Sequence, residues 1–534
     1  ATVGIGIALC SWVPVAMAGE GEDMQVSPVN TSISVMLLGS IGFQMLLFYL
    51  VNWSDRDIKR YSWQVISQTI SIFCAVLLFQ AFNGIVEDYV MAGGSKLWEV
   101  AVDMMQLWFW LTALQVVLAV TSGAINQVWG GAPPSMEVVE LRVKSWAELF
   151  AHLAGFASIN AWGSLQQQIF NGSPLLAVCV VPIGWIGLFV MYTGYDTVRE
   201  YIATADDGKK DEFEYMWDEE AEEVEHDIAG MSLSFLTVQA VRFHISGVLP
   251  DQEGIEEWNM TVSHTGVQCK QLLGIGFLFF FLSLLPLVLE DKFKDGIHKC
   301  SHRMQELVTR STEVWNGFFM FGNAWCFFYG VKWALASSGF TSENALLSVV
   351  LALLLSALSF MFIFILDKVV DNQLLGEDSE VADAGVEKLI TALGVLVGFS
   401  WEQSFDVAVS VVSASSKDYL PPAVSKLLMS VLLVAIVFPA WRLYILKTLH
   451  DITDDEVDEG RFLLKRASEE HRELFLDKET EEHALDMAHL KMKQHRRLAL
   501  GKPTPTQGTG LKHLRVTTMG LVEVDQPAVP RRLG

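Results

Sequence analysis

Eleven long apolar runs constrain this sequence more than any other feature. A helix needs about 20 residues to cross the hydrocarbon core of a bilayer, and 51% of the 534 residues are hydrophobic. A soluble enzyme would not place so many runs of this length one after another. The runs predict an all-α, polytopic membrane protein with about 11 transmembrane helices, and the lipid bilayer is its first expected partner. They lie near 33–52, 64–88, 100–121, 146–170, 174–196, 228–247, 266–289, 313–335, 344–366, 388–409 and 421–445.

Alternate loops between these runs differ in positive charge. If the N-terminus is outside, the cytoplasmic loops carry fourteen Lys and Arg residues and the opposite loops carry two to four. Because cytoplasmic loops are the ones enriched in positive charge, we predict an N-terminus outside and a cytoplasmic C-terminus. The sequons at Asn30 and Asn259 fall on the predicted outer side, as glycosylation candidates should. The cytoplasmic loops would be 53–61, 123–144, 197–227, 290–312 and 367–384.

A short string recurs in the first helix of each of the five helix pairs that follow the first run. Its copies are FQAF, INAW, VQAV, GNAW and GFSW, and they follow one another at spacings of 80, 79, 84 and 76 residues. Recurrence at a nearly fixed period indicates repeated structural units. The sequence therefore predicts one lone helix and five parallel two-helix repeats of about 80 residues. The repeats would lie near 62–122, 145–196, 227–289, 311–368 and 386–446.

The second position of this string is an amide residue in four copies and Phe399 in the fifth. Aligned copies place these residues at one depth, which leaves two interpretations. Amide side chains bond across transmembrane helices, so the layer can be a packing device. The alternative is a polar ring, in which the five first helices surround a central axis. The four amides are Gln80, Asn160, Gln239 and Asn323.

Charged residues near the strings are the candidates for an ion path. Glu402 and Asp406 are four residues apart, so they share a helix face. Arg242 aligns with Glu402, which predicts an ion pair because an unpaired charge in a bilayer is costly; otherwise Arg242 extends to the surface. Glu87 aligns with Asp406, and two acids at one vestibule would attract cations, unless water near the headgroups simply solvates them. His244 lies between the two depths and could exchange protons near neutral pH.

The ends of the chain and one acidic segment differ in composition from the apolar runs. Residues 206–227 hold twelve acids, which predicts a self-repelling cytoplasmic loop. This loop and the tail 450–500 are the candidate surfaces for a cytoplasmic protein partner. We predict an extracytoplasmic segment 1–30, whose residues 1–18 resemble either a signal sequence or a short flank, a transmembrane domain 31–449, a helical cytoplasmic tail 450–500 and a disordered tail 501–534.

Familiar catalytic motifs do not occur in this sequence. It holds no HExxH, no GxSxG and no phosphate-binding glycine loop, so we expect no enzyme activity. The six cysteines form no CxxC pair, and we expect no metal, no cofactor and no nucleic-acid partner. The repeat, the polar layers and the outer acids favour a channel or transporter for ions, above all cations or protons. The alternative is a membrane scaffold or receptor that transports nothing and recruits partners through its acidic loop and tail.

Overall fold

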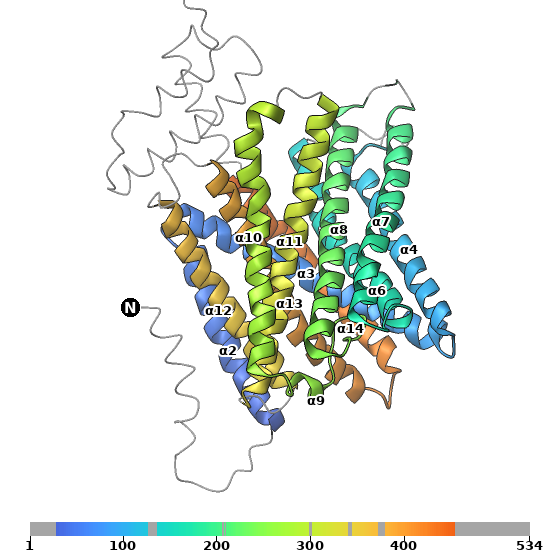
Figure 1. The fold of residues 1–534 in the computed structure, drawn as a ribbon, viewed down its shortest axis with the longest axis vertical. Helices are drawn as coiled ribbons and strands as arrows, with labels where there is room; N and C mark the ends of the chain where they lie inside the picture. Colours follow the sequence, from blue (N-terminus) through green and yellow to red (C-terminus); the bar gives the residue numbers. More distant parts are fainter. Residues whose placement is uncertain are drawn as a thin grey trace, which may run out of the picture. The chain divides into compact units, whose positions relative to one another are not determined.

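The described part of the chain is entirely helical. A computed structural model describes residues 28–125, 136–205, 208, 210–297, 302–339, 344–371 and 380–453, and no strand occurs among them. The all-α prediction is confirmed for these residues. Their helices belong to one compact unit, Ala1–Leu374 with Val381–His450, drawn in Figure 1. The predictions for residues 1–27 and for the tail after residue 453 lie outside the described residues.

Helices occupy all eleven of the predicted apolar runs. Nine helices in the described residues are long and apolar enough to cross a membrane, and α6 and α11 are not among these nine. This is compatible with a polytopic membrane protein. The bounds are α2 Pro28–Val51, α3 Arg56–Val86, α4 Lys96–Ser122, α6 Met136–Gln168, α7 Pro174–Ala203, α8 Glu212–Ser246, α9 Trp258–Thr261, α10 Gly266–Ile297, α11 His302–Ser337, α12 Asn344–Asp371, α13 Glu380–Ser415 and α14 Pro422–Ala440; the π-helical turns η1 Glu87–Met91 and η2 Trp441–Leu446 follow α3 and α14.

Several helices extend beyond the apolar runs into the predicted loops. α8 begins at Glu212, where a capping box satisfies its first backbone N–H groups. The prediction of a loop over 206–227 was therefore wrong from residue 212 onward. Arg199 of α7 pairs with Asp218 at 3.0 Å and with Glu225 at 2.5 Å. This buried cation offsets part of the repulsion among the acids of the helix.

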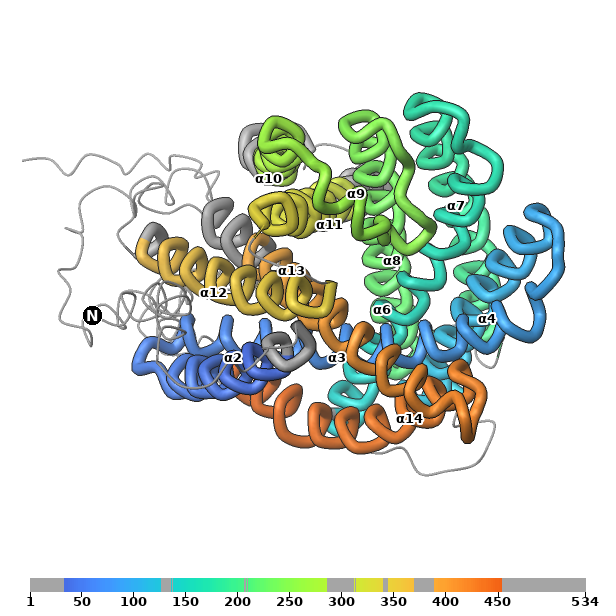
Figure 2. The backbone as a smooth tube through the Cα atoms, turned by 90° about the horizontal axis from the view of Figure 1, so that it is seen from below, coloured from blue at the N-terminus to red at the C-terminus, as the bar shows by residue number. Residues whose placement is uncertain are grey.

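Five long helices form a closed ring in which each contacts the next. α3 contacts α6, α6 contacts α8, and α8 contacts α11. Phe399 of α13 packs on Trp325 of α11 with ring centroids 4.1 Å apart. Gly394 and Gly398 of α13 lie so close to α3 that a Cβ atom on either would collide with its side chains. Figure 2, which is seen from below, shows this ring of α3, α6, α8, α11 and α13.

The other helices lie outside the ring and pack in the same cyclic order. Each packs against the ring helix that follows it in the sequence: α4 against α6, α7 against α8, and α10 against α11. α12 lies against α13, where Trp401 donates to the hydroxyl of Ser356 at 2.9 Å. α14 then closes the cycle on α3, and the lone helix α2 lies against α12 and α3 (Figure 2). The repeat of about 80 residues itself stays a prediction.

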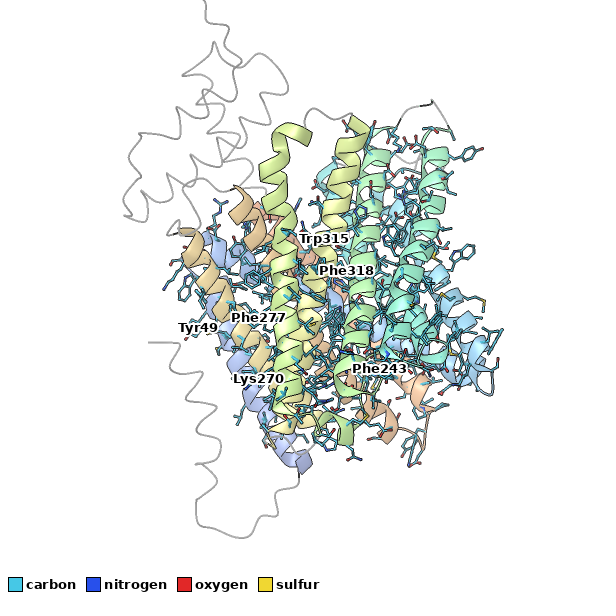
Figure 3. The ribbon with its side chains drawn as sticks, viewed as in Figure 1. Tyr49, Phe243, Lys270, Phe277, Trp315 and Phe318 are labelled. Carbon is cyan, nitrogen blue, oxygen red and sulfur yellow. The ribbon has the colours of Figure 1, made fainter. Side chains whose placement is uncertain are left out.

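The outer helices expose many large apolar side chains. Tyr49 on α2 is 67% exposed and Phe277 on α10 is 50% exposed, and the ring helix α11 also presents Trp315, which is 43% exposed (Figure 3). On α7 and α14, Phe189 and Ile436 are exposed to a similar degree. Large apolar surfaces in water mark association sites or aggregation hazards. A belt of such side chains around several helices is what lipid tails would cover.

Candidate functional site

A small cavity lies at the centre of the ring, and all five ring helices line it. Its volume is about 40 Å³, which is room for about three water molecules. Seven of its thirteen lining residues are aromatic. The polar ones are Gln80 of α3, Asn160 of α6, Glu402 and Gln403 of α13, and Glu253 of the connection between α8 and α9. The alignment put Gln80 and Asn160 in one layer and Glu402 in the next, three residues further on, and the structure places all three at this cavity.

Glu402 is the more buried of the two acids that line this cavity. It is 4% exposed, and Gln80 donates to its carboxylate through Nε2 at 3.3 Å. The carbonyl oxygens Oε1 of Gln80 and Oδ1 of Asn160 are buried, and neither accepts a hydrogen bond from the described part of the protein. Buried acceptors are normally satisfied by protein, water or ions. The cavity wall therefore offers oxygen atoms that a small polar guest can use.

A hydrogen-bond network behind the cavity holds Asn160 in place. Asn160 donates through Nδ2 to Asp103 of α4 at 2.8 Å. Gln106 donates to Asn83 at 3.0 Å, and Asn83 in turn donates to Glu87 at 2.9 Å. Because the amide N–H groups of Asn160 are used by this network, its carbonyl oxygen is left for the cavity. Sequence reasoning missed Asp103, although an acid inside the apolar run 100–121 was a signal that could have found it.

Aromatic side chains close the cavity on the side of the predicted cytoplasm. Phe399 lies between Phe156 at 5.2 Å and Trp325 at 4.1 Å, measured between ring centroids. Phe235 packs on the edge of Trp325 at 5.0 Å. Below them, one apolar cluster joins Phe399 to the ring helices through Ile72, Val76, Met231 and Leu396. The centre of the ring therefore has a polar level above an apolar constriction.

Arg242 does not pair with Glu402, so this prediction was wrong. Its guanidinium is 1% exposed and donates to Glu256 at 2.6 Å and to the carbonyl of Gly254 at 3.0 Å. It also lies over the ring of Tyr329, with the guanidinium carbon 3.5 Å from the centroid. The connection after α8 folds back over the ring and supplies a closer carboxylate. Comparison of repeated helices could not place Glu256, because it belongs to a connection outside the repeated strings.

Two further side chains bind the carboxylate of Glu256. Its second oxygen accepts from Trp333 Nε1 at 2.9 Å and lies 3.0 Å from Nε2 of His264. Burial opposes ionisation of Glu256, but the charge of Arg242 and the hydrogen bond from His264 more than offset it, and they lower the pKa to about 2. Arg242, Glu256 and their partners form a clasp at the outer end of the ring. We call this group the outer clasp.

The remaining predicted site residues lie away from the cavity. Gln239 donates to the backbone carbonyl of Asp251 at 2.8 Å, and Asn323 is buried. Neither residue lines the cavity. The predicted ring of four amides is thus reduced to Gln80 and Asn160 at the cavity. His244 is exposed on α8. Asp406 forms an ion pair with Lys426 of α14 at 2.7 Å.

Glu87 and Asp406 are both close enough to Glu253 to influence its ionisation. Burial is the largest cause that raises the pKa of Glu253, and the charges of Asp251, Glu87 and Asp406 raise it further, to about 8. Acids from η1, α13 and the connection after α8 therefore lie near this carboxyl group. Glu253 carried no sequence signal of its own, since it lies among several acids of the stretch DQEGIEE.

The glycosylation candidates stay predictions. Asn259 is exposed on the short helix α9, where a sugar could be attached. The hydroxyl of Thr261, the third residue of this sequon, donates to the carbonyl of Glu257 at 3.2 Å. The side chain of Asn30 lies outside the described part of the structure.

The outer clasp should make the stability of the protein depend on pH in acid. The pKa of Glu256 is held at about 2, below its ordinary value of 4.5. A lowered carboxyl pKa stabilises the folded state fully above the unfolded pKa, and this stability is lost as pH falls through the folded pKa. We expect a loss of about 3 kcal/mol between pH 4.5 and pH 2. Denaturation of detergent-solubilised protein, compared with Glu256→Gln, checks this, and an equal difference between the two at pH 7 and pH 2.5 would contradict it.

Comparison of the chain with protein-family models, with curated proteins and with solved structures gives no match.

Proposed function

We propose that this protein is a multi-pass membrane channel or transporter that moves cations or protons through the centre of the five-helix ring. The observation that carries the proposal is the central cavity, to which every ring helix contributes and in which Glu402 is buried. Buried acids in membrane proteins commonly mark ion and proton pathways. The acids at the outer end would raise the local concentration of cations.

The cyclic packing supports a path along the ring axis. Five first helices surround one axis, and each outer helix packs on the next ring helix. On this proposal the five copies of the string near residues 79–401 are five equivalent units, and the axis between them is where a path would run. The polar level of Gln80, Asn160 and Glu402 would bind the passing ion.

The aromatic constriction would be the closed gate of this path. Hydrophobic constrictions block ions because water leaves them. Phe399, Phe156, Phe235 and Trp325 come from four ring helices, pack on one another and form part of the cavity wall. Opening would require these helices to separate or the rings to rotate. On this proposal the described conformation is closed toward the cytoplasm.

Neutralising Glu402 tests the proposal. In proteoliposomes, Glu402→Gln should reduce cation or proton flux at least tenfold, which corresponds to about 1.4 kcal/mol of lost stabilisation of the ion. The matched control is Asp418→Asn, which removes an exposed acid at the outer end of the same helix hairpin. The control should keep wild-type flux. Equal flux in wild type and Glu402→Gln would overturn the proposed path.

The scaffold alternative makes the opposite prediction for the same proteins. If the polar residues only hold helices together, no wild-type flux of any cation or proton is expected above that of empty liposomes. Substitution of Gln80 and Asn160 by Leu would then alter stability alone. A flux that changes in stably folded variants would favour the ion path.

A further inference from the structure

The connection between α8 and α9 folds inward and covers the outer end of the ring. Gln239 and Gln167 donate to the backbone carbonyls of Asp251 and Leu249, at 2.8 and 3.4 Å. A Cβ atom on Gly163 of α6 would lie 2.7 Å from the carbonyl oxygen of Gln252. The connection is therefore held by α6 and α8 at close range, together with the outer clasp. Residues 248–257 are called the outer loop below.

A tight turn in the outer loop places Glu253 at the cavity. The side chain of Asp251 accepts from the backbone N–H groups of Glu253 at 3.1 Å and Ile255 at 2.6 Å. Gly254 has a φ of +81°, and a Cβ atom there would collide with the hydroxyl of Tyr329. Only glycine satisfies both requirements. The turn is thus fixed from both sides, and Glu253 is the one residue of the outer loop that lines the cavity.

Two carboxylates from different segments therefore line a single cavity. No ion pair involves Glu253 or Glu402 in the described part of the chain, and the nearby ammonium of Lys332 is bonded to Gln403 Oε1 at 3.3 Å. Asn160, which is 1% exposed, contributes a carbonyl oxygen without a protein partner, as does Gln80. Two carboxyl groups, which lose their protons when a cation binds, and two amide oxygens form an oxygen-rich set of the kind that hard divalent cations prefer.

We propose that this cavity binds one hard divalent cation of the calcium class, with Glu402 of α13 and Glu253 of the outer loop as its carboxylate ligands. Gln80 Oε1 and Asn160 Oδ1 are the further ligands. The volume of about 40 Å³ leaves space for the ion and one or two waters. The inference rests on the proposed function in one respect: it takes the bound ion to be the ion that is transported through the ring. The outer loop then both completes the site and covers it.

Calcium-dependent stabilisation of the purified protein tests the site directly. The melting temperature of full-length protein in detergent is measured against increasing CaCl₂, with NaCl adjusted to constant ionic strength. Wild type should gain stability as the logarithm of the calcium concentration rises, as linkage requires for a ligand of the folded state. Glu253→Gln and Glu402→Gln should each weaken apparent calcium affinity at least tenfold. Glu257→Gln, which removes an exposed acid at the end of the outer loop that does not line the cavity, should behave as wild type.

A second measurement keeps the inference testable if a variant does not fold. In wild type alone, calcium should slow amide hydrogen exchange of residues 248–257, since the ion ties Glu253 to α13. No calcium effect on either stability or exchange in wild type would overturn the inference, and so would a Glu253→Gln variant with wild-type affinity. Equal stabilisation by sodium at the same ionic strength would also overturn it.

The outcomes separate this inference from the proposed function. Calcium binding that depends on Glu253 and Glu402, in a protein that shows no flux, supports the site and removes the transport role. Cation or proton flux that depends on Glu402, in a protein that does not bind calcium, supports transport and overturns the site.

Discussion

Replacing Glu256 with glutamine should lower the free energy of unfolding by about 3–5 kcal/mol. Arg242 is 1% exposed, and the variant leaves its charge buried without the carboxylate at 2.6 Å. The lost partner also supported Trp333 and His264. Denaturation in mixed detergent micelles measures the effect, and the exposed neighbour Glu257, changed to glutamine, is the control. The control should stay within about 0.5 kcal/mol of wild type.

A double substitution separates the lost pair from general damage. Removing both charges, with Arg242→Met and Glu256→Met together, should be less destabilising than Glu256→Gln alone, because an apolar pair leaves no buried charge unpaired. A Glu256→Gln variant as stable as wild type would mean that Arg242 reaches water or another acid. A double variant that loses as much as the sum of its single changes would mean that the two residues act independently.

The long helices could be predicted from hydropathy, but their ends could not. Apolar runs follow the part of a helix that lipid or core would cover, whereas backbone hydrogen bonds continue as long as caps and charges allow. α8 shows this most clearly, since it starts at Glu212 and passes through acids that Arg199 neutralises. That cation lies on another helix, so no local pattern around the acids could reveal it.

The candidate site was partly predictable because its residues lie at related depths along neighbouring helices, and aligned strings give that depth. Aligned strings placed Gln80 and Asn160 in one layer and Glu402 three residues further along its helix, and these three meet in the cavity. The partner of Arg242 was not predictable in this way, since Glu256 comes from the outer loop. Depth says nothing about angle around a helix, and this is why His244 is exposed although it lies between the predicted levels.

The fifth string carries the aromatic residue Phe399 where the other four carry an amide, and the structure shows what this side chain does in the ring. At the equivalent position the other strings carry Gln or Asn, which would bring water to the axis. Phe399 instead fills the space between Phe156 and Trp325. The most divergent string therefore contributes both the more buried acid of the cavity and the ring that lies directly beneath it. An ion held at Glu402 would meet an apolar barrier within about one helical turn.

Replacing Phe399 with alanine should open this barrier, and ion leak through the protein should rise at least tenfold in proteoliposomes. Removing the ring leaves a gap that water can enter, so the constriction no longer excludes ions by dewetting. The same change should cost about 3–5 kcal/mol of stability, as large-to-small core substitutions do. Phe399→Leu, which keeps most of the apolar volume, should stay closed. Cation flux, or the signal of a pH-sensitive dye, measures the leak, and the thermal stability of each variant is recorded as well.

A buried phenylalanine away from the axis gives the matched control for Phe399→Ala. Phe279 of α10 is 8% exposed and packs on Phe319 with ring centroids 5.4 Å apart, outside the ring. Phe279→Ala should lose a similar amount of stability without raising the leak, because its cavity does not connect to the axis. Equal leak in both alanine variants would assign the effect to loosened packing. Wild-type flux in a folded Phe399→Ala variant would mean that the barrier lies elsewhere, since Phe399 is the side chain that joins the aromatic rings of α6 and α11 across the axis.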